Sequence, residues 1–373
     1  MSLIVTFLGK GGTGRTILAI AAAMAQAQQG KTVLLLSQDS SPALGLALGC
    51  EVGVDPVTIG PNLRVQSLKT THLLEQSWTQ LKEMEQQYLR SPFFSSVYGQ
   101  ELGVLPGMDS ALALNYLREL SQDNRDELII YDGNSSPETL RMLAMPDILG
   151  WYARRFRQVF SNSDLGKTLL PFVQPVATAV LSVNWSEDVL QQPTQKATGM
   201  LEQGRDAVAD PQQVAAYLVT TGDPLAQATA QYLWGSAQQV GLTVGGVLWN
   251  QGIGGGADAV PLAETFAPLP IVPLPQVDRS GASFNWDPLV AAMPDFRSAS
   301  QAPRSLQVNE ATGQVKLFLP SFNKKQVKLT QYGPEITIEA GDQRRNIFLP
   351  PSLEGKGVTG AKFADSYLTI SFA

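Results

Sequence analysis

The first forty residues alternate between apolar runs, a glycine-rich turn and a long alanine-rich stretch. Leu3–Leu8 is continuously apolar and ends at a glycine, Thr16–Gln29 consists largely of strong helix formers, and Val33–Leu36 is apolar again. A continuous apolar run suits a strand that is buried on both faces of a parallel sheet, and alanine-rich sequence favours a helix. We therefore predict a strand–loop–helix–strand unit, which almost always forms a right-handed crossover.

The same alternation continues over the next two hundred residues. It predicts strands at residues 63–68, 127–132, 215–219 and 244–249, with helices at residues 72–88, 108–120, 137–160 and 225–240. Regular alternation of strands and helices indicates an α/β fold with a doubly wound, mostly parallel sheet. Residues 72–120 and 150–210 hold more helix than the crossovers require. We expect these two stretches to form a helical subdomain at the edge of the sheet.

The pattern changes near Pro303, after which apolar and polar positions alternate with period two. This alternation appears in Val315–Leu319, Val327–Leu329, Ile336–Ile338 and Tyr367–Ile370, with turn residues between them. Period-two patterning predicts a small antiparallel β-sandwich. Residues 304–373 also contain nine Lys or Arg and six Asp or Glu, whereas the whole chain has a net charge of -6. We therefore expect an α/β domain at residues 1–300 and a β-sandwich domain at residues 304–373.

Composition excludes several kinds of site. The chain has one cysteine, Cys50, and one histidine, His72. Together they supply neither an internal disulfide nor the four ligands of a structural zinc site, so we expect no zinc. A Ser-His-Asp triad or a Cys-His pair would have to use His72. Any catalysis is therefore expected to rest on carboxylates, Lys, Arg, hydroxyls and backbone N–H groups.

Charge and hydropathy narrow the class of protein further. The acidic balance gives no reason to expect nucleic acid as a partner. No run of 18 apolar residues is present, as a membrane-spanning helix would need. The N-terminus lacks the basic region of a signal peptide and its apolar stretch runs straight into glycines. We expect a cytoplasmic protein.

A glycine-rich segment joins the first predicted strand to the first predicted helix. Its residues are Gly9, Lys10, Gly11, Gly12, Thr13, Gly14, Arg15 and Thr16. Glycines allow successive backbone N–H groups to turn toward an anion, and the helix N-terminus adds about half a positive charge. Thr16 is placed to coordinate Mg²⁺, and Asp132 ends an apolar strand as a Walker-B acid does. These features predict a phosphate-binding loop, the alternative being a glycine-rich turn that binds nothing.

One position departs from the usual pattern of such loops. The residue before the Ser or Thr is ordinarily lysine, and here it is Arg15. A guanidinium keeps the charge but is bulkier and planar, so the replacement is not conservative. We expect nucleotide binding to tolerate this change better than fast hydrolysis does.

Lys10, at the start of the loop, gives the pattern K-G-G-x-G-x-T. This deviant loop resembles that of the dimeric ATPases of the arsenite-pump and tail-anchored-protein-targeting family. The resemblance extends over about residues 1–295. It implies a homodimer that binds and hydrolyses ATP with Mg²⁺, in which Lys10 reaches across to the partner's nucleotide.

Two further segments are similar to the switch segments of that family. Ser37–Ser41 (SQDSS) stands where the family has S-T-D-P-A, and Asp132–Arg141 (DGNSSPETLR) is similar to D-T-A-P-T-G-H-T-L-R without its middle. The resemblance implies that Asp39 orients the attacking water and that Asp132 acts from the second switch. Both carboxylates would bind Mg²⁺ through water.

The adenine site and the client site are implied by the same resemblance. Asn250 stands in an N-Q pair that contacts adenine in the family, and Pro275 lies in a segment that supplies the other wall. Leu169–Val183 and Pro92–Met108 are apolar but interrupted by Pro and Gly, like the helices that line a client groove there. The alternative is that these two stretches are ordinary core.

Cys50, as the sole cysteine, separates this chain from several relatives of that family. The nitrogenase iron protein needs two cluster cysteines per chain, eukaryotic targeting ATPases use a cysteine pair for a zinc-bridged dimer, and arsenite pumps bind the metalloid through cysteines. Cell-division and partitioning ATPases remain an alternative, although they usually add a membrane-binding tail or bind DNA.

The implied partner is an apolar polypeptide, such as the helix of a tail-anchored membrane protein, with transient membrane association through a receptor. A second hypothesis is a holdase in which nucleotide is a structural ligand with little turnover. Arg15 and the altered switch segments motivate that hypothesis.

The C-terminal domain resembles the α-crystallin (small heat-shock, HSP20) fold. Arg345–Pro350 (RNIFLP) is similar to its R-x-I-x-L-P strand end, and Ala361–Ile370 is similar to A-x-x-x-x-G-x-L-x-I. Ser366 stands in place of the glycine of that second motif. The alternative is a generic β-sandwich appended to the first domain.

Overall fold

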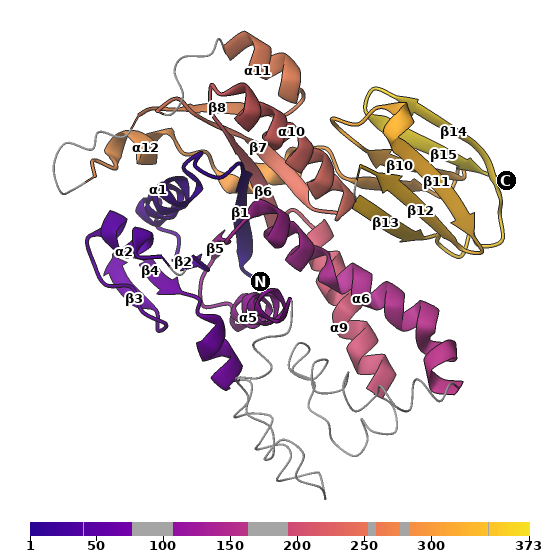
Figure 1. Ribbon diagram of the computed structural model, residues 1–373, viewed down its shortest axis with the longest axis horizontal. Coiled ribbons are helices and arrows are strands. Elements are labelled where there is room, and N and C mark those ends of the chain that lie inside the picture. Colours follow the sequence, from indigo (N-terminus) through magenta and orange to yellow (C-terminus); the bar gives the residue numbers. More distant parts are fainter. Residues whose placement is uncertain (40, 77–106, 163–192, 253–258, 277–283, 342) are drawn as a thin grey trace, which may run out of the picture.

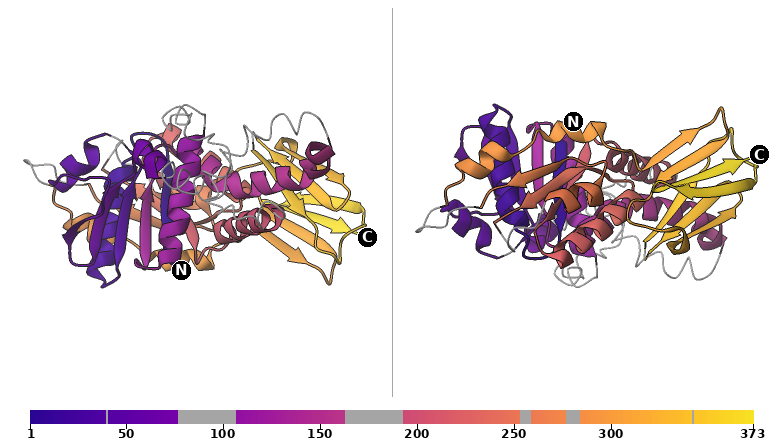
Figure 2. Two further views of the ribbon diagram at one scale, coloured as in Figure 1. Left: turned by 90° about the horizontal axis from the view of Figure 1, so that it is seen from below. Right: turned by 90° about the horizontal axis from the view of Figure 1, so that it is seen from above.

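The computed structural model describes all residues except 40, 77–106, 163–192, 253–258, 277–283 and 342. A large sheet with helices on both faces forms one end of the molecule, and a smaller β-domain forms the other (Figures 1 and 2). The doubly wound α/β fold and the additional all-β domain predicted from the sequence are both confirmed.

The large sheet has eight strands in the order β3-β4-β2-β5-β1-β6-β7-β8. These are β1 (Leu3–Gly9), β2 (Val33–Ser37), β3 (Val57–Gly60), β4 (Leu63–Ser67), β5 (Leu128–Asp132), β6 (Val214–Thr220), β7 (Thr243–Asn250) and β8 (Ile271–Leu274). Only the pairing of β3 with β4 is antiparallel. The sequence did not predict the two edge strands, β3 and β8. Each is four residues long and exposed or only partly buried over most of its length, and β8 contains Pro273, so neither carries the signal of a buried strand. Strand β5 lies between β1 and β2 and pairs with both.

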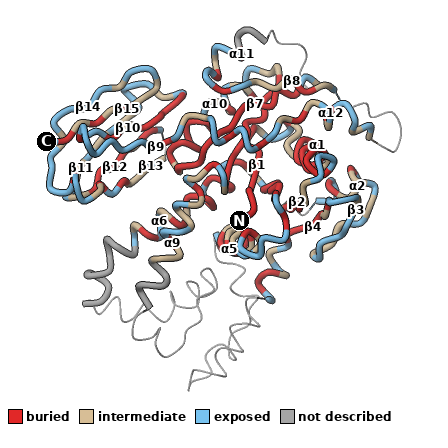
Figure 3. Tube along the Cα trace, turned by 180° about the vertical axis from the view of Figure 1, so that it is seen from behind, coloured by how far each residue is buried: buried red, intermediate tan, exposed pale blue. Residues whose placement is uncertain are grey.

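Helices cover both faces of this sheet. The α-helices are α1 (Arg15–Gln28), α2 (Ala43–Leu48), α5 (Met108–Asp123), α6 (Ser136–Asn162), α9 (Pro193–Ala209), α10 (Pro224–Gln239), α11 (Ala259–Phe266) and α12 (Asp287–Ala292), and η2 (Phe296–Gln301) is a 3₁₀ helix. Side chains of α1, α12 and η2, such as Ile20 and Phe296, form one core against the sheet. Side chains of α5, α6, α10 and α11, such as Leu112 and Leu233, form the other. The buried strands between these layers stand out in Figure 3.

The described parts of the two stretches expected to form a helical subdomain differ from one another. The first packs onto the sheet, and the second projects beyond it. Residues 77–106 and 163–192 lie outside the described residues. Helix α5 packs onto the sheet itself, where Leu112 and Leu117 join the core with Ile4 and Ile129. Helices α6 and α9 run side by side and project beyond the sheet (Figure 1). Their close approach depends on Gly204, since an added Cβ there would lie 3.1 Å from the Pro146 ring.

The β-domain consists of two antiparallel sheets, β14-β15-β10-β9 and β11-β12-β13. Its strands are β9 (Leu306–Asn309), β10 (Gln314–Phe318), β11 (Val327–Tyr332), β12 (Glu335–Ala340), β13 (Gln343–Phe348), β14 (Val358–Ala364) and β15 (Tyr367–Phe372), with the 3₁₀ helix η3 (Lys324–Gln326) before β11. Val315, Leu317, Ile336, Ile338 and Ile370 form its own core between the sheets. The period-two pattern therefore predicted the inward faces of this domain.

The β-domain is joined to the rest of the molecule along α10. The rings of Trp234 and Phe318 meet edge to face with centroids 5.6 Å apart. Gly235 leaves room for the ring of Phe322, which an added Cβ would approach within 2.5 Å. Arg345 Nη1 donates a hydrogen bond of 2.9 Å to the Gln238 carbonyl oxygen at the end of α10. Burial lowers the pKa of the Arg345 guanidinium to about 10, so the cation persists at neutral pH and neutralises the negative end of the helix dipole.

Candidate functional site

The glycine-rich loop has the backbone of a phosphate-binding loop. It leaves β1 at Gly9 and enters α1 at Arg15. Gly12 and Gly14 have φ values of 83° and 96°, a left-handed conformation that favours glycine. Gly9 is also required, because an added Cβ would overlap the Val219 carbonyl oxygen of β6. Thr13 closes the turn by donating from its hydroxyl to the Lys10 carbonyl oxygen over 2.8 Å.

Two side chains from distant parts of the chain hold this loop in place. The Ser136 hydroxyl accepts from the Gly9 N–H and donates to the Gly9 carbonyl oxygen, both over 2.9 Å. Asn250 Nδ2 donates to the Thr13 carbonyl oxygen over 2.9 Å, and its Oδ1 accepts from the Gly252 N–H over 3.1 Å. Sequence reasoning assigned Asn250 to adenine, and the structure shows its amide holding the loop. Sequence reasoning did not single out Ser136. The only sign of its role was its place at the start of a helix, shortly after Asp132.

A buried carboxylate lies beside the loop. Asp132 is 3% exposed at the end of β5, and the Ser37 hydroxyl of β2 donates to its Oδ2 over 3.2 Å. Burial raises the pKa of the Asp132 carboxyl, while hydrogen bonding from Thr16 and the positive charge of Arg15 act in the opposite direction.

The hydroxyl of Thr16 and the carboxylate of Asp132 therefore face one another, and both are oxygen donors of the kind that Mg²⁺ prefers. The loop beside them is open, since nothing lies within 4 Å of a Cβ added at Gly11 or Gly12. The residues present thus fit a nucleotide phosphate with Mg²⁺. Among the described residues, no group of three or more His, Cys, Asp or Glu side chains is placed to hold a metal ion by itself.

Arg15 points at the segment that follows Asp132. Its Nη2 donates to the Asn134 carbonyl oxygen over 3.0 Å, and its Nη1 makes a longer contact of 3.4 Å with the Gly133 carbonyl oxygen. Gly133 packs between the Tyr131 ring and the Thr139 hydroxyl. A Cβ added at Gly133 would overlap these groups. The residue that replaces the usual lysine thus joins the loop to the predicted second switch.

The remaining predicted residues lie at the same edge of the sheet. Asp39 follows β2, accepts from the Ser41 N–H and hydroxyl over 2.9 Å each, and acts electrostatically on Asp132. Lys10 is half-buried within the loop. Pro275 follows β8, whose Leu274 carbonyl oxygen accepts from the Gln251 N–H over 3.1 Å. Every residue that the sequence proposed for the site therefore lies near the carboxyl end of one of five strands, namely β1, β2, β5, β7 and β8.

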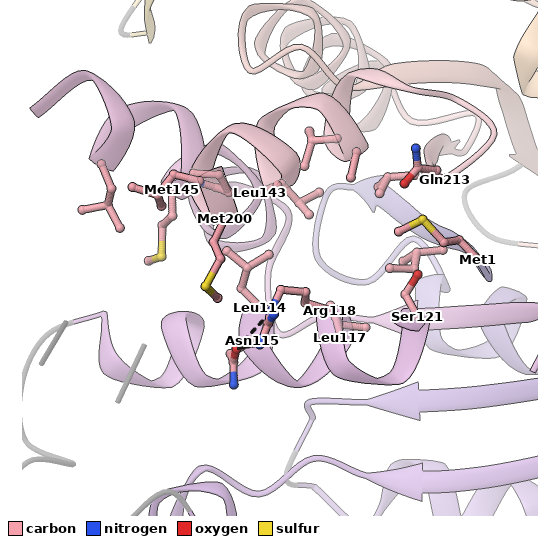
Figure 4. Close-up of a pocket in the computed structure, with 18 residues that line it drawn as sticks. Met1, Leu114, Asn115, Leu117, Arg118, Ser121, Leu143, Met145, Met200 and Gln213 are labelled. Atoms are coloured by element: carbon pink, nitrogen blue, oxygen red, sulfur yellow. Dashed lines mark hydrogen bonds between the residues drawn. The ribbon is translucent and has the colours of Figure 1, made fainter. Parts of the chain in front are cut away.

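A second feature lies at the opposite edge, near the amino ends of β1 and β6. It is an apolar pocket between α5, α6 and α9, partly open to solvent (Figure 4). Its lining includes Met1, Leu114, Leu143, Met145, Met200 and Leu201, with Arg118 and Asn115 of α5 as polar members. The sequence did not predict this pocket. The proposed groove segments Leu169–Val183 and Pro92–Met108 lie outside the described residues, apart from Gly107 and Met108.

Within the described ranges, no helix is both long and apolar enough to cross a bilayer.

Comparisons with known proteins agree with this geometry. The family model for anion-transporting ATPases matches residues 2–259, and the model for the HSP20-like domain found in ArsA matches residues 310–372. A putative arsenical pump-driving ATPase of Prosthecochloris vibrioformis is 24% identical, with 99% of this chain and 95% of the relative covered. A putative arsenical pump-driving ATPase 1 of Aquifex aeolicus is 19% identical over 98% of this chain and 99% of the relative. An ATPase ASNA1 homolog of Babesia bovis is 31% identical over 38% of each chain.

The family match spans the strand, loop and helix that build the phosphate site, and the second match spans most of the β-domain. Both resemblances inferred from the sequence are confirmed, and ATP hydrolysis follows from the family. This chain is a member of the anion-transporting ATPase family that carries a C-terminal HSP20-like domain.

Proposed function

We propose that this ATPase works as a homodimer in the cytoplasm and couples its nucleotide state to an apolar polypeptide client, as a chaperone or targeting factor. One observation carries the proposal: helix α6 belongs to both sites. Ser136, its first residue, is hydrogen-bonded to Gly9 of the phosphate loop. Seven to thirteen residues further on, Leu143, Met145 and Leu149 line the apolar pocket. A movement of the loop that is passed on through α6 would therefore change the pocket.

The chain's residues suit phosphoryl transfer, which depends on positioned charge more than on covalent chemistry. Bound Mg²⁺–ATP supplies the phosphoryl group and charge neutralisation. The loop N–H groups would bind the phosphates, Thr16 and Asp132 would hold Mg²⁺, and Asp39 would orient the attacking water. Lys10 would stabilise phosphate charge at the partner's site. Asn250 holds the loop whether or not it also contacts adenine, with Pro275 as the other wall.

The pocket favours an apolar client over a metalloid. Methionine side chains are flexible and polarisable, which suits surfaces that accept varied apolar partners, and three of them line this pocket. Cys50 is the only thiol of the chain, so a multi-cysteine arsenite site is not expected in one subunit. A membrane-protein helix delivered through a receptor is the client class that fits, in line with the ASNA1-type relatives.

Complementation between two inactive variants tests the dimer and the role of Lys10 together. Lys10→Ala and Asp132→Asn are each expected to lose ATP hydrolysis. Mixed dimers would contain one site with both groups intact, so a 1:1 mixture should recover about a quarter of wild-type activity if subunits exchange freely. Wild-type activity in Lys10→Ala alone, or no recovery after verified subunit exchange, would contradict the trans role of Lys10.

A second function is favoured by the contact of Arg15 with Asn134, which commits the loop cation to a protein carbonyl. In this version the protein is a holdase, and nucleotide stabilises it with little turnover. Asp132→Asn should then suppress client aggregation as well as the wild type does, with and without ATP. The coupled ATPase instead predicts that ATP changes client retention in the wild type and not in Asp132→Asn.

A further inference from the structure

The ends of β2 and β5 are joined on both faces of the sheet. On one face, Ser37 donates to the Asp132 carboxylate over 3.2 Å. On the other, the Tyr131 hydroxyl donates to Gln38 Oε1 over 2.5 Å. Between them the Gln38 N–H donates to the Asp132 carbonyl oxygen over 2.9 Å. The two residues that precede Asp39 are therefore each fixed to β5.

Tyr131 is held rigidly for this contact. Its side chain is 1% exposed in the core between the sheet and α5 and α6. The ring lies under Gly133, and the hydroxyl oxygen is 3.6 Å from Met142 Sδ of α6. Burial, reinforced by the neighbouring Asp132, raises the pKa of the Tyr131 phenol well above its ordinary value. Packing of the ring in the core holds the hydroxyl beside the Gln38 side chain.

Asp39 has few other anchors. Its N–H donates to the Ser37 hydroxyl over 3.3 Å, and its carboxylate accepts only from Ser41 among the hydrogen bonds of the described residues. Ser41 follows it by two residues, so these bonds move with the segment and do not tie it to the sheet. The direction in which Asp39 leaves β2 is thus set by the residue before it, Gln38.

We propose that Tyr131 is a positioning residue for ATP hydrolysis, which acts through Gln38 to fix the orientation of Asp39. The inference rests on the proposed role of Asp39 in orienting the attacking water. Without the Tyr131 hydroxyl, the Gln38 side chain loses its tether, and the following peptide is held only by the Gln38 N–H bond to Asp132 and the longer bond from the Asp39 N–H to the Ser37 hydroxyl. A displacement of about 1 Å in such a group lowers the rate of the chemical step by up to about a hundredfold. Substrate binding by the glycine-rich loop would be untouched.

The test is a double-mutant cycle on the full chain with Tyr131→Phe, Gln38→Leu and the combined variant. Each single change should lower kcat about tenfold, with the KM for ATP within about twofold of wild type. The double variant should be no slower than the slower single variant, because one contact is removed in all three. Affinity for Mg²⁺–ADP with aluminium fluoride, a mimic of the transferring phosphoryl group, should fall in parallel with kcat, while affinity for ADP stays unchanged.

Two controls separate positioning from a structural role. Gln38→Glu keeps an acceptor for the Tyr131 hydroxyl and should retain more activity than Gln38→Leu. Met142→Leu removes the sulfur beside Tyr131 while preserving volume, and should leave kcat at the wild-type value. Three outcomes would each overturn the inference. The first is that Tyr131→Phe or Gln38→Leu loses ADP affinity as much as kcat, and the second is that the losses in the double variant are additive. The third is that the single variants have a lowered Tm but a normal kcat.

Asp39→Asn, measured beside these variants, distinguishes two kinds of failure. If Asp39→Asn is inactive and Tyr131→Phe is as fast as wild type, the role of Tyr131 is wrong and that of Asp39 stands. If Asp39→Asn is as fast as wild type, the proposed role of Asp39 is wrong, and the inference about Tyr131 falls with it.

Discussion

The Arg15 guanidinium donates a hydrogen bond of 3.0 Å to the carbonyl oxygen of Asn134. Arg15 occupies the loop position where related loops carry lysine, and Asn134 lies two residues beyond the buried carboxylate of Asp132. The contact therefore ties the phosphate loop to the segment predicted to be the second switch. We expect Arg15 to release this hydrogen bond when its guanidinium turns toward a bound phosphate.

Arg15→Lys is expected to hydrolyse ATP faster than the wild type. A lysine ammonium is a compact point charge and cannot reproduce the guanidinium fork. Release of one hydrogen bond worth about 1 kcal/mol corresponds to about a fivefold increase in kcat. Steady-state phosphate release measures this change. Arg15→Ala is the control, and should lose both nucleotide affinity and rate. Slower hydrolysis by Arg15→Lys than by the wild type would show that the guanidinium serves the phosphates better than lysine does.

Asp132→Asn should be more stable than the wild type at neutral pH, although it loses activity. Burial raises the pKa of the Asp132 carboxyl, so its ionised form is disfavoured in the folded protein relative to the unfolded chain. Asparagine keeps an oxygen for the Ser37 and Thr16 hydroxyls without that charge. A gain of about 1 kcal/mol would raise Tm by roughly 1–2 °C in a chain of this length.

The pH dependence of this gain follows from the sign of the shift. A raised pKa means that the folded wild type holds its proton where the unfolded chain has released it. The advantage of Asp132→Asn should therefore be complete above the raised pKa and disappear as the pH falls toward the ordinary value of an aspartate. Calorimetry in the absence of nucleotide and Mg²⁺ over this range measures it. An advantage that grows on acidification would contradict the assignment.

Gly235→Ala should destabilise the protein even though alanine favours helices. Its Cβ would lie 2.5 Å from the Phe322 ring and 2.8 Å from the Pro320 carbonyl oxygen, at the contact between α10 and the β-domain. Overpacking of this kind costs about 1–3 kcal/mol. Gly199→Ala in α9 is the matched control, because nothing lies within 4 Å of its added Cβ. That change should stabilise by up to about 1 kcal/mol. Urea unfolding followed by tryptophan fluorescence compares the two, and equal effects would argue against tight packing at Gly235.

Ser366→Gly should stabilise the β-domain. Asp365 and Ser366 form the turn between β14 and β15 with φ values of 51° and 61°. A turn with two left-handed residues favours glycine at its second position, and relief of this strain is worth about 1 kcal/mol. Ser366→Ala keeps a Cβ at the same φ and should give no gain. Thermal unfolding of the full chain distinguishes them, and a gain of equal size in both variants would point to the lost hydroxyl as its cause.

Six of the eight strands in the sheet of the first domain could be predicted, because these inner strands are largely buried on both faces. Val33–Leu36 is apolar throughout, Leu3–Leu8 is apolar except for Thr6, and Glu127–Asp132 is apolar between its two charged ends. These segments coincide closely with β2, β1 and β5, respectively. Strand β3 lies at the edge, where solvent removes the apolar constraint, so its sequence carried no comparable signal.

The contacts that shape the site could not be predicted in the same way. The pairs Ser37 with Asp132, Gln38 with Tyr131, and Ser136 with Gly9 exist because β5 is inserted between β2 and β1. The order of strands in a sheet results from how helices pack on its two faces, and the composition of a single strand does not record it. Asn250 shows the same limit, since its partner Thr13 lies 237 residues away.

The sequence by itself determined the phosphate loop, the two kinds of domain and the charged residues of the candidate site. These features depend on spacing within short segments, where glycines allow left-handed backbone and apolar runs form strands. Only the tertiary structure decided what holds those residues: the hydroxyls and amides that fix the loop, the engagement of Arg15 with Asn134, and the α6 helix shared by both sites. The physical reason is that a hydrogen bond between distant segments depends on how the whole chain packs, and neither partner shows it alone.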